Sequence, residues 1–161
     1  IVIHHISLPA GYFAGPAIAD LFCNTLDCNS HPSFAELNGL KVSSHFLIRR
    51  HGLLLQFVSI DNRAWHAGQS EFMGRSRCND FSVGIELEGD ADRPFTKSQY
   101  RKLNFLIQAL ARQLPIKYLA GHSDIAPGRK FDPGPRFDWS ELHKVSSANR
   151  LSRPYAGRPD M

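Results

Sequence analysis

A stretch near the C-terminal end of the chain carries the residue types that bind metals and transfer protons. Residues 121–135 read GHSDIAPGRKFDPGP and hold one histidine, two aspartates and two basic side chains among three glycines and three prolines. Proline fixes φ and glycine permits positive φ, so we expect a shaped loop rather than a helix or strand. A stiff loop can hold imidazole and carboxylate groups in a fixed array, as a metal or catalytic site requires. An ordinary surface turn with solvated charges is the alternative for this stretch alone.

Eight histidines along the chain supply further nitrogen donors. Hydrolytic zinc sites use three protein ligands drawn from His, Asp, Glu and Cys, and they leave one position open for water. Spacing does not select a set among these histidines, because the ligands would come from distant strands and loops. Taken singly, a histidine is more often structural than a ligand.

Composition indicates one globular domain without a membrane span. The chain has 161 residues, of which 21% are charged and 42% hydrophobic, and no apolar run approaches the roughly 20 residues that cross a bilayer. The net charge of +4 is modest and the Lys and Arg residues are scattered, which argues against nucleic acid as the main partner and suits a small anionic ligand. The chain opens at Ile1 within an apolar run, so we expect N-terminal residues to be missing, and a signal peptide would lie among them.

Three cysteines, Cys23, Cys28 and Cys78, form no dense framework and no zinc-type pair. We interpret them as free thiols in a reducing compartment, with a Cys23–Cys28 bridge as the alternative.

The elements that must position the chemical groups are predicted to form a mixed sheet. Residues 1–6 indicate a buried strand on which His4 and His5 point to opposite faces. Residues 44–50 and 53–60 flank His51-Gly52 as a β-hairpin. Residues 61–80 lack periodicity and are interpreted as a binding loop. Residues 81–87 alternate strictly and put Glu86 and Glu88 on the face opposite an apolar one.

Helices are predicted from caps and apolar stripes. A short amphipathic helix follows Gly15-Pro16, and a longer one starts at the capping box of residues 96–99 and ends before Pro115. Residues 116–120 indicate another strand, residues 139–144 a helical turn or two, and residues 146–161 a peripheral tail. Hairpin and crossover connections together predict a single α/β domain over residues 1–161, with a mixed β-sheet flanked by helices.

Five blocks of the sequence resemble N-acetylmuramoyl-L-alanine amidases of the AmpD type, which are cytoplasmic zinc enzymes that recycle anhydro-muropeptides. The blocks are IHHISLP at 3–9, VSSHFLI at 42–48, RAWHAG at 63–68, RCNDFSVGIELEG at 77–89 and the loop at 121–135. They follow the family order, and the resemblance covers nearly everything from Ile3 to Trp139. The resemblance implies the fold shared with peptidoglycan recognition proteins and phage-type amidases.

The resemblance also implies a ligand set and a general base. One Zn²⁺ would be held by His4, His122 and Asp132. The general base would be Glu86, the first Glu of GIELEG, which would accept a proton from the attacking water. The residues alone give Glu86 and Glu88 nearly equal claims, and we expect Glu88 to face solvent.

The implied substrate is the amide bond between N-acetylmuramic acid and L-alanine in muropeptides. Lys130 would stabilise the oxyanion of the tetrahedral intermediate, with a solvated surface lysine as the alternative. Arg77 matches a family arginine that binds the peptide. Lys41 stands where close relatives carry arginine, so a single ammonium group replaces a guanidinium group that can donate two parallel hydrogen bonds to a carboxylate. The predicted substrate-binding residues are His5, Lys41, Trp65, His66 and Arg77.

The predicted function is therefore zinc-dependent hydrolysis of muropeptides by a cytoplasmic monomer with no nucleic-acid or membrane partner. One alternative is a periplasmic or phage-type amidase acting on polymeric peptidoglycan, which an export signal ahead of Ile1 would favour. A second alternative is a non-catalytic peptidoglycan-binding module. Such modules lose a zinc ligand or the base, whereas this chain keeps all the matching residues.

Overall fold

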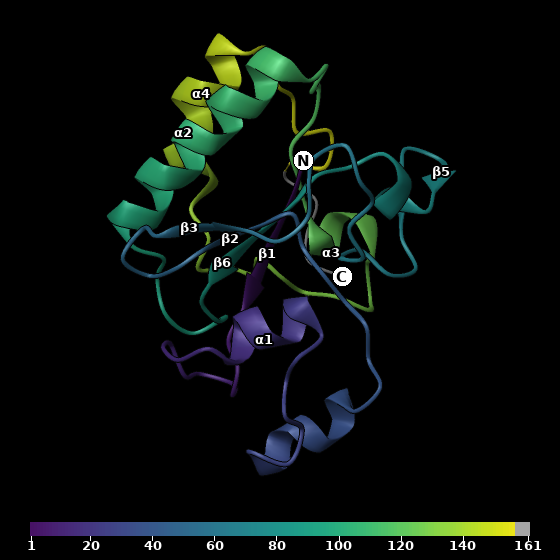
Figure 1. Ribbon diagram of the computed structural model, residues 1–161. Helices are drawn as coiled ribbons and strands as arrows, with labels where there is room; N and C mark the ends of the chain where they lie inside the picture. The colour runs from purple at the N-terminus through teal and green to yellow at the C-terminus, as the bar shows by residue number, and fades with distance from the viewer. Residues whose placement is uncertain (157–161) are drawn as a thin grey trace.

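The computed structural model describes residues 1–156, which form a five-stranded mixed sheet with helices on both faces (Figure 1). The strand order is β3-β2-β6-β1-β7. Among the described residues of this sheet, β2 and β3 form the only antiparallel pair, and the other neighbouring strands run parallel. The predicted α/β class with a mixed sheet is confirmed. The strands of the sheet are β1 (Val2–Ile6), β2 (Phe46–Ile48), β3 (Leu54–Gln56), β6 (Gly84–Glu88) and β7 (Ala120–Gly121).

Helices and short turns connect and cover these strands. The α-helices are α1 (Ala17–Cys23), α2 (Lys97–Gln113), α3 (His122–Ile125) and α4 (His143–Ala148). Short 3₁₀ turns are η1 (Pro32–Leu37), η2 (Cys78–Asp80) and η3 (Trp139–Leu142). A separate hairpin consists of β4 (Glu71–Phe72) and β5 (Arg75–Ser76).

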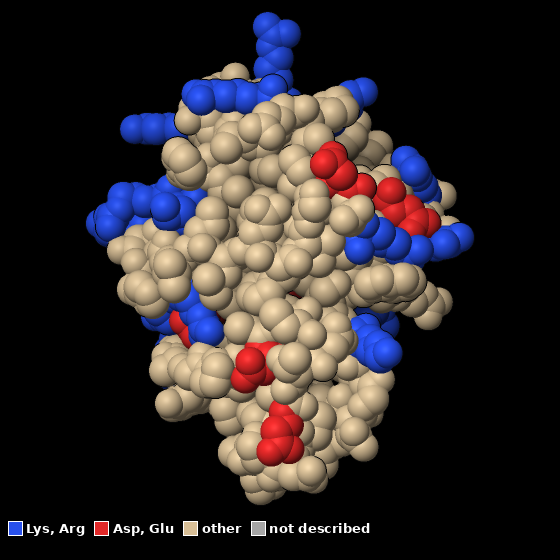
Figure 2. All heavy atoms as spheres, in the orientation of Figure 1, with Lys and Arg blue, Asp and Glu red and all other residues tan. Residues whose placement is uncertain are grey.

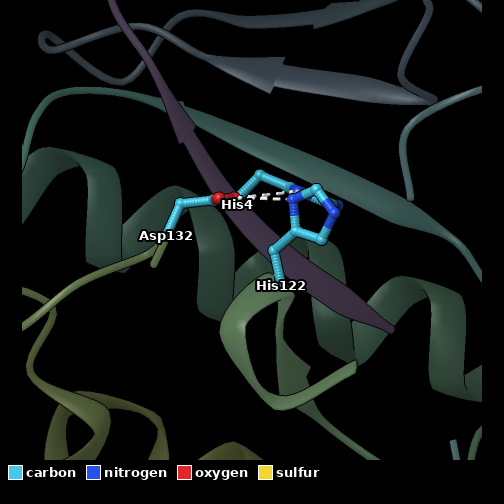
Figure 3. A group of neighbouring side chains, drawn as sticks. All are labelled: His4, His122 and Asp132. Atoms are coloured by element: carbon cyan, nitrogen blue, oxygen red, sulfur yellow. Dashed lines mark hydrogen bonds and ion pairs between the residues drawn. The ribbon is translucent and has the colours of Figure 1, made fainter. Parts of the chain in front are cut away.

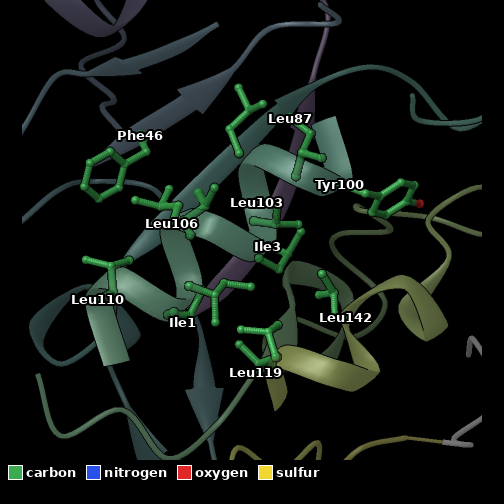
Figure 4. Packing of buried hydrophobic residues seen from close by; sticks show 14 of the residues in the cluster. Ile1, Ile3, Phe46, Leu87, Tyr100, Leu103, Leu106, Leu110, Leu119 and Leu142 are labelled. Carbon is green, nitrogen blue, oxygen red and sulfur yellow. The ribbon is translucent and has the colours of Figure 1, made fainter. Parts of the chain in front are cut away.

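One face of the sheet carries the main hydrophobic core beneath α2 (Figure 4). The predicted capping box starts α2: the Thr96 hydroxyl accepts from the Gln99 amide at 3.1 Å, and the Gln99 side chain accepts from the Thr96 amide at 3.0 Å. The apolar stripe of α2 packs on the strand residues of this face. Because alternate strand residues share a face, the core is lined by Ile1, Ile3, Ile85, Leu87, Phe46 and Ile48.

The opposite face is covered in two separate places. Leu21 and Phe22 of α1 pack on Leu47 of β2. A small cluster forms where residues 67 and 78 of the long loop meet β1, β7 and α3. Between these clusters lie His4 and Glu86, which are partners in the parallel pair of β1 and β6. Partners in neighbouring strands project to the same side, so the fold places an imidazole and a carboxylate together on this face.

Four stretches differ from the prediction. Residues 121–135, expected as a loop rather than a helix or strand, include Gly121 of β7 and the helix α3 (His122–Ile125). The strand expected at 116–120 shortens to Ala120–Gly121, and the loop at 61–80 contains the β4–β5 hairpin. The tail expected to be peripheral packs on the domain: Leu151 is buried in the main core, and Ser152 forms a bridge with Tyr118. Burial of Leu151 removes apolar surface from water, and Ser152 pairs with backbone groups of Lys117 and Leu119, just ahead of β7. Residues 157–161 of that expected tail lie outside the described residues.

Most charged side chains are scattered over the surface and the cysteines are unpaired, as the sequence predicts. In the view of Figure 2, Lys and Arg are spread around the outline of the molecule, with Asp and Glu among them. Cys23, Cys28 and Cys78 are free thiols. Among the described residues, no helix combines the length and the apolar character needed to cross a bilayer.

Candidate metal centre

His4, His122 and Asp132 converge on the face of the sheet that lies opposite the main core (Figure 3). His4 belongs to β1, His122 opens α3, and Asp132 lies in the loop after α3. Nδ1 of His4 lies 3.0 Å from both Nδ1 of His122 and Oδ2 of Asp132, and the remaining distance is 3.1 Å. Three lone-pair atoms at such separations need a cation between them, either ring protons or a metal ion. Four-coordinate zinc with bonds of about 2.0–2.1 Å separates its ligand atoms by about 3.3 Å, so this triangle fits that ion.

Burial and the close approach of these ligand candidates to one another set their charges. Burial lowers the pKa of His4 to about 4, and the adjacent Asp132 carboxylate only partly opposes this shift. Burial alone would raise the pKa of Asp132, but the adjacent His122 and His4 rings outweigh it and hold this pKa well below its usual range. Near neutral pH the site therefore offers a neutral imidazole and a carboxylate, the protonation states that bind metals.

The orientation of His122 follows from its second ring nitrogen. Nε2 of His122 lies 3.1 Å from the Ala67 carbonyl oxygen, which can only accept a hydrogen bond. Nε2 therefore carries a proton, and in the neutral ring Nδ1 presents its lone pair to His4 and Asp132. Metal-binding histidines typically use their other nitrogen in this way.

The segment of residues 121–135, which includes α3, brings His122 and Asp132 together through its glycines and its backbone. The Ser123 amide donates to the Asp132 carbonyl at 2.9 Å. A Cβ at Gly121 would lie 2.7 Å from Cδ of Pro133, so only glycine allows this close approach. Arg129 donates to the carbonyls of Ala67 and Gln69 at 2.7 and 2.6 Å and so ties the loop to the neighbouring segment.

Glu86 is buried beside His4 and has unused hydrogen-bonding capacity. Within the described part of the chain, its Oε2 has no hydrogen-bond partner. Burial raises the pKa of Glu86 well above its usual value, the charge of Asp132 adds to the shift, and Lys130 opposes it. A buried carboxylate with a free oxygen and a raised pKa is suited to proton transfer in a hydrolytic site.

Lys130 lies at the edge of the site with an exposed side chain. Its positive charge adds to the lowering of the His4 pKa and opposes the raising of the Glu86 pKa. A cation in this position can stabilise negative charge that develops on a substrate oxygen.

Glu88 does not face solvent, and the expectation that it would is wrong. Only 2% of its surface is exposed, and its carboxylate pairs with Arg49 at 2.7 Å. The face that carries Glu86 and Glu88 is covered by segments from distant parts of the chain, so both glutamates are interior. Glu88 has a structural partner, whereas Glu86 has a free oxygen.

The predicted substrate-binding residues occupy different environments. His5 points away from His4 and contacts Phe131 and the Pro133 carbonyl. Lys41, Trp65 and Arg77 have exposed side chains, and two hydrogen bonds between Ser43 and Trp65 join the segment after Lys41 to Trp65. His66 is buried, and its Nδ1 lies 2.9 Å from Nε2 of His4. The structure thus brings His66 into contact with His4 and leaves Lys41, Trp65 and Arg77 on the surface.

Two supporting residues were not identified from the sequence. The Asn79 side-chain oxygen accepts from the amides of His66 and Ala67 at 3.0 and 2.8 Å, and Arg129 holds the Ala67 carbonyl. Both stabilise the segment that contacts His4 and His122. Their place within the blocks at 77–89 and 121–135 could have marked them as candidates. Their contacts could not be predicted, because they join residues that are far apart in the sequence.

The comparisons with known proteins agree with this geometry. Residues 1–135 match the family described as N-acetylmuramoyl-L-alanine amidase. The chain is 54% identical over 147 residues to the 1,6-anhydro-N-acetylmuramyl-L-alanine amidase AmpD of Enterobacter cloacae, covering 90% of this chain and 79% of the relative.

Two solved structures are similar over most of the chain. A crystal structure of a Se-Met AmpD derivative has a TM-score of 0.86 at 50% identity and covers 89% of this chain and 82% of its own. The amidase AmiD from E. coli, in complex with anhydro-N-acetylmuramic acid-L-Ala-D-gamma-Glu-L-Lys, has a TM-score of 0.66 at 32% identity. That likeness covers 90% of this chain and 56% of the AmiD chain.

Proposed function

The chain belongs to the N-acetylmuramoyl-L-alanine amidase family, and from this premise we propose that it hydrolyses the amide bond between 1,6-anhydro-N-acetylmuramic acid and L-alanine in muropeptides. The reaction would serve the recycling of cell-wall fragments. The observation that carries the proposal is the triangle of His4, His122 and Asp132 beside a buried glutamate with a free oxygen. The AmiD complex with an anhydro-muropeptide supports this substrate class.

The proposed metal is one Zn²⁺ held by His4, His122 and Asp132. Two nitrogens and one carboxylate oxygen form a common ligand set of hydrolytic zinc sites. When bound, zinc would polarise the scissile carbonyl and lower the pKa of the attacking water.

Glu86 and Lys130 would perform the remaining steps. Glu86 would take the proton from the attacking water and deliver it to the leaving nitrogen of L-alanine. Its raised pKa suits both halves of this transfer. Lys130 would stabilise the oxyanion through its positive charge and need not transfer a proton. The presence of both groups beside the metal ligands favours an enzyme over a non-catalytic binding module.

The muropeptide would contact side chains around this centre. We assign peptide-carboxylate contacts to Arg77 and Lys41, and contacts with the sugar or the peptide to Trp65 and His5. The proposed assembly is a monomer, and the proposed compartment is the cytoplasm, which the three free thiols fit.

The decisive test combines metal analysis of the purified protein with mass spectrometry of its products from an anhydro-muropeptide. We expect one zinc per chain, release of anhydro-N-acetylmuramic acid and of a peptide that begins with L-alanine, and loss of activity with a chelator that added Zn²⁺ restores. Full turnover by protein shown to be metal-free would disprove the mechanism. Absence of both products from the zinc-loaded protein would disprove the function.

A further inference from the structure

His66 lies behind His4, on the side away from His122 and Asp132. Nδ1 of His4 faces those two residues, while its Nε2 lies 2.9 Å from Nδ1 of His66. The two rings meet edge to face, with an interplanar angle of 83°. A residue so placed has no direct access to a substrate at the metal centre, but it contacts the one ring nitrogen of His4 that a metal would leave unused.

A series of hydrogen bonds runs from His4 through His66 and Ser82 to the Cys78 carbonyl. The direction of each bond follows from this last acceptor. Ser82 Oγ lies 2.7 Å from the Cys78 carbonyl oxygen, which can only accept, so the hydroxyl proton is committed there. Ser82 Oγ must then accept from Nε2 of His66, at 3.3 Å. A neutral imidazole has one donor and one acceptor, so Nδ1 of His66 accepts the proton on Nε2 of His4. Nδ1 of His4 keeps its lone pair, directed at the metal site.

The His66 ring packs directly on the backbone of Gly84. A Cβ at Gly84 would lie 2.4 Å from Cγ of His66 and 2.7 Å from two further ring atoms, closer than any side chain tolerates. The glycine in β6 therefore lets the ring lie directly on the strand backbone. The His66 amide is held as well, because it donates to Asn79 at 3.0 Å.

We propose that His66 is a positioning residue whose hydrogen bond with His4, anchored by Ser82 and the Cys78 carbonyl, fixes the tautomer and ring orientation with which His4 binds the metal. This inference rests on the proposed zinc site and assigns His66 to metal affinity instead of substrate contact. Hydrogen-bond partners behind metal-binding histidines typically contribute 10–100-fold to metal affinity.

Two substitutions at position 66 separate the hydrogen bond from the filling of space. His66→Phe keeps an aromatic ring on Gly84 and removes the acceptor, so zinc affinity should fall by about 10–100-fold. His66→Asn places a side-chain oxygen near the position of Nδ1, where it can accept from His4. We expect His66→Asn to recover most of the lost affinity, which a role in packing alone would not produce.

The experiment measures the zinc affinity of chelator-treated full-length protein by competition with a colorimetric chelator, together with the melting temperature of each metal-free protein. A matched control is Gln99→Met, which removes a buried side chain that donates to the carbonyls of Ile48 and Glu88 on the other face of the sheet. It should lower the melting temperature and leave zinc affinity within about twofold, because distant sites act independently.

The outcomes distinguish this inference from the proposed function. If wild-type protein binds no zinc, the proposed metal site fails. If wild-type protein binds zinc and a folded His66→Phe binds it equally well, the role of His66 alone is overturned. Should His66→Phe not fold, Ser82→Ala decides, because it removes the anchor without adding volume. A fall in zinc affinity supports the series of hydrogen bonds, and unchanged affinity overturns it.

Discussion

Arg49 and Glu88 form an ion pair in the interior of the protein, with Nη1 of Arg49 2.7 Å from Oε1 of Glu88. Oε2 of Glu88 accepts from the Arg50 amide at 3.0 Å, and Arg49 also donates to the Gly15 carbonyl at 2.8 Å. The pair joins the end of β6 to the segment after β2 and to the start of α1. Glu86, on the same face two residues earlier, has a free oxygen instead. The two carboxylates therefore differ in partners, and this difference separates a structural role from a reactive one.

Glu88→Gln should destabilise the protein because it leaves the buried charge of Arg49 without its counter-ion. Removing one partner of a buried pair costs about 3–5 kcal/mol, and the lower end applies because glutamine keeps a hydrogen-bond acceptor. We expect a loss of about 3 kcal/mol, or roughly 6–12 °C in Tm, measured by thermal unfolding. The control is Glu36→Gln on an exposed side chain, with a change within about 0.5 kcal/mol. Equal melting temperatures for the two variants would contradict the structural role of Glu88.

Glu86→Gln should abolish most of the activity without loss of zinc. The amide cannot accept the proton of the attacking water, and removing a general base lowers kcat by about 10²–10⁴-fold. Zinc content and kcat are measured on the folded protein, with Glu88→Gln assayed below its melting temperature as the comparison. Glu88→Gln should keep kcat within a few-fold. Similar kcat losses in the two variants would show that the general base is wrongly assigned.

Alternation along residues 81–88 predicts that Glu86 and Glu88 share a face, and the strand β6 has this arrangement. The sequence pattern could not predict that this second face is buried. The residues that cover it come from α1, η1 and the long loop, which are distant along the chain and have no local periodicity that points to β6. Glu88 was therefore expected in solvent, although its counter-ion Arg49 lies in the predicted hairpin.

Lys130→Met should lower kcat by about 10²–10³-fold while zinc is retained, the scale of losing one group that stabilises an oxyanion. Steady-state kinetics on an anhydro-muropeptide, with metal analysis of the same preparation, checks this. Lys144→Met replaces an exposed lysine on α4 and should leave both kcat and KM unchanged. A change confined to KM would make Lys130 a substrate-binding residue instead.

His4→Ala should lose zinc and activity together, while His5→Ala should keep zinc and substantial activity. The two side chains project to opposite faces of β1, and Nδ1 of His5 lies 3.1 Å from the Pro133 carbonyl instead of the metal site. Zinc stoichiometry of the two purified variants decides the assignment. A metal-free His5→Ala with a zinc-loaded His4→Ala would reverse it.

The ligand candidates could not be selected from spacing, since His4 is 118 residues from His122 and 128 from Asp132. The resemblance to a family provided the set. The role of His66 was harder to predict. Its place in an aperiodic loop suggested substrate contact, whereas the structure buries it behind His4. Gly84 was the available signal, because glycine inside a strand often marks close approach of another group. The identity of that group depends on a contact between residues 66 and 84, which no local pattern reveals.

In the metal-free protein, Glu86 should reduce stability increasingly as the pH rises. Burial and the charge of Asp132 raise the pKa of Glu86 well above 4.5. The folded protein therefore holds this proton more tightly than the unfolded chain does. The stability that protonated Glu86 contributes is complete below about pH 4.5 and is lost as the pH rises through the raised pKa of the folded state.

Glu86→Gln imitates the protonated carboxyl at every pH, so the metal-free variant and wild type should melt at similar temperatures near pH 4.5. By about pH 8 the variant should melt at a higher temperature, because wild type must then bury a charge or pay for keeping its proton. Scanning calorimetry of chelator-treated proteins across this range measures the gap, and added Zn²⁺ should narrow it, since a nearby cation favours the carboxylate. A gap that does not change with pH would mean that Glu86 is solvated in the folded protein, and its role as a buried general base would then lose its physical basis.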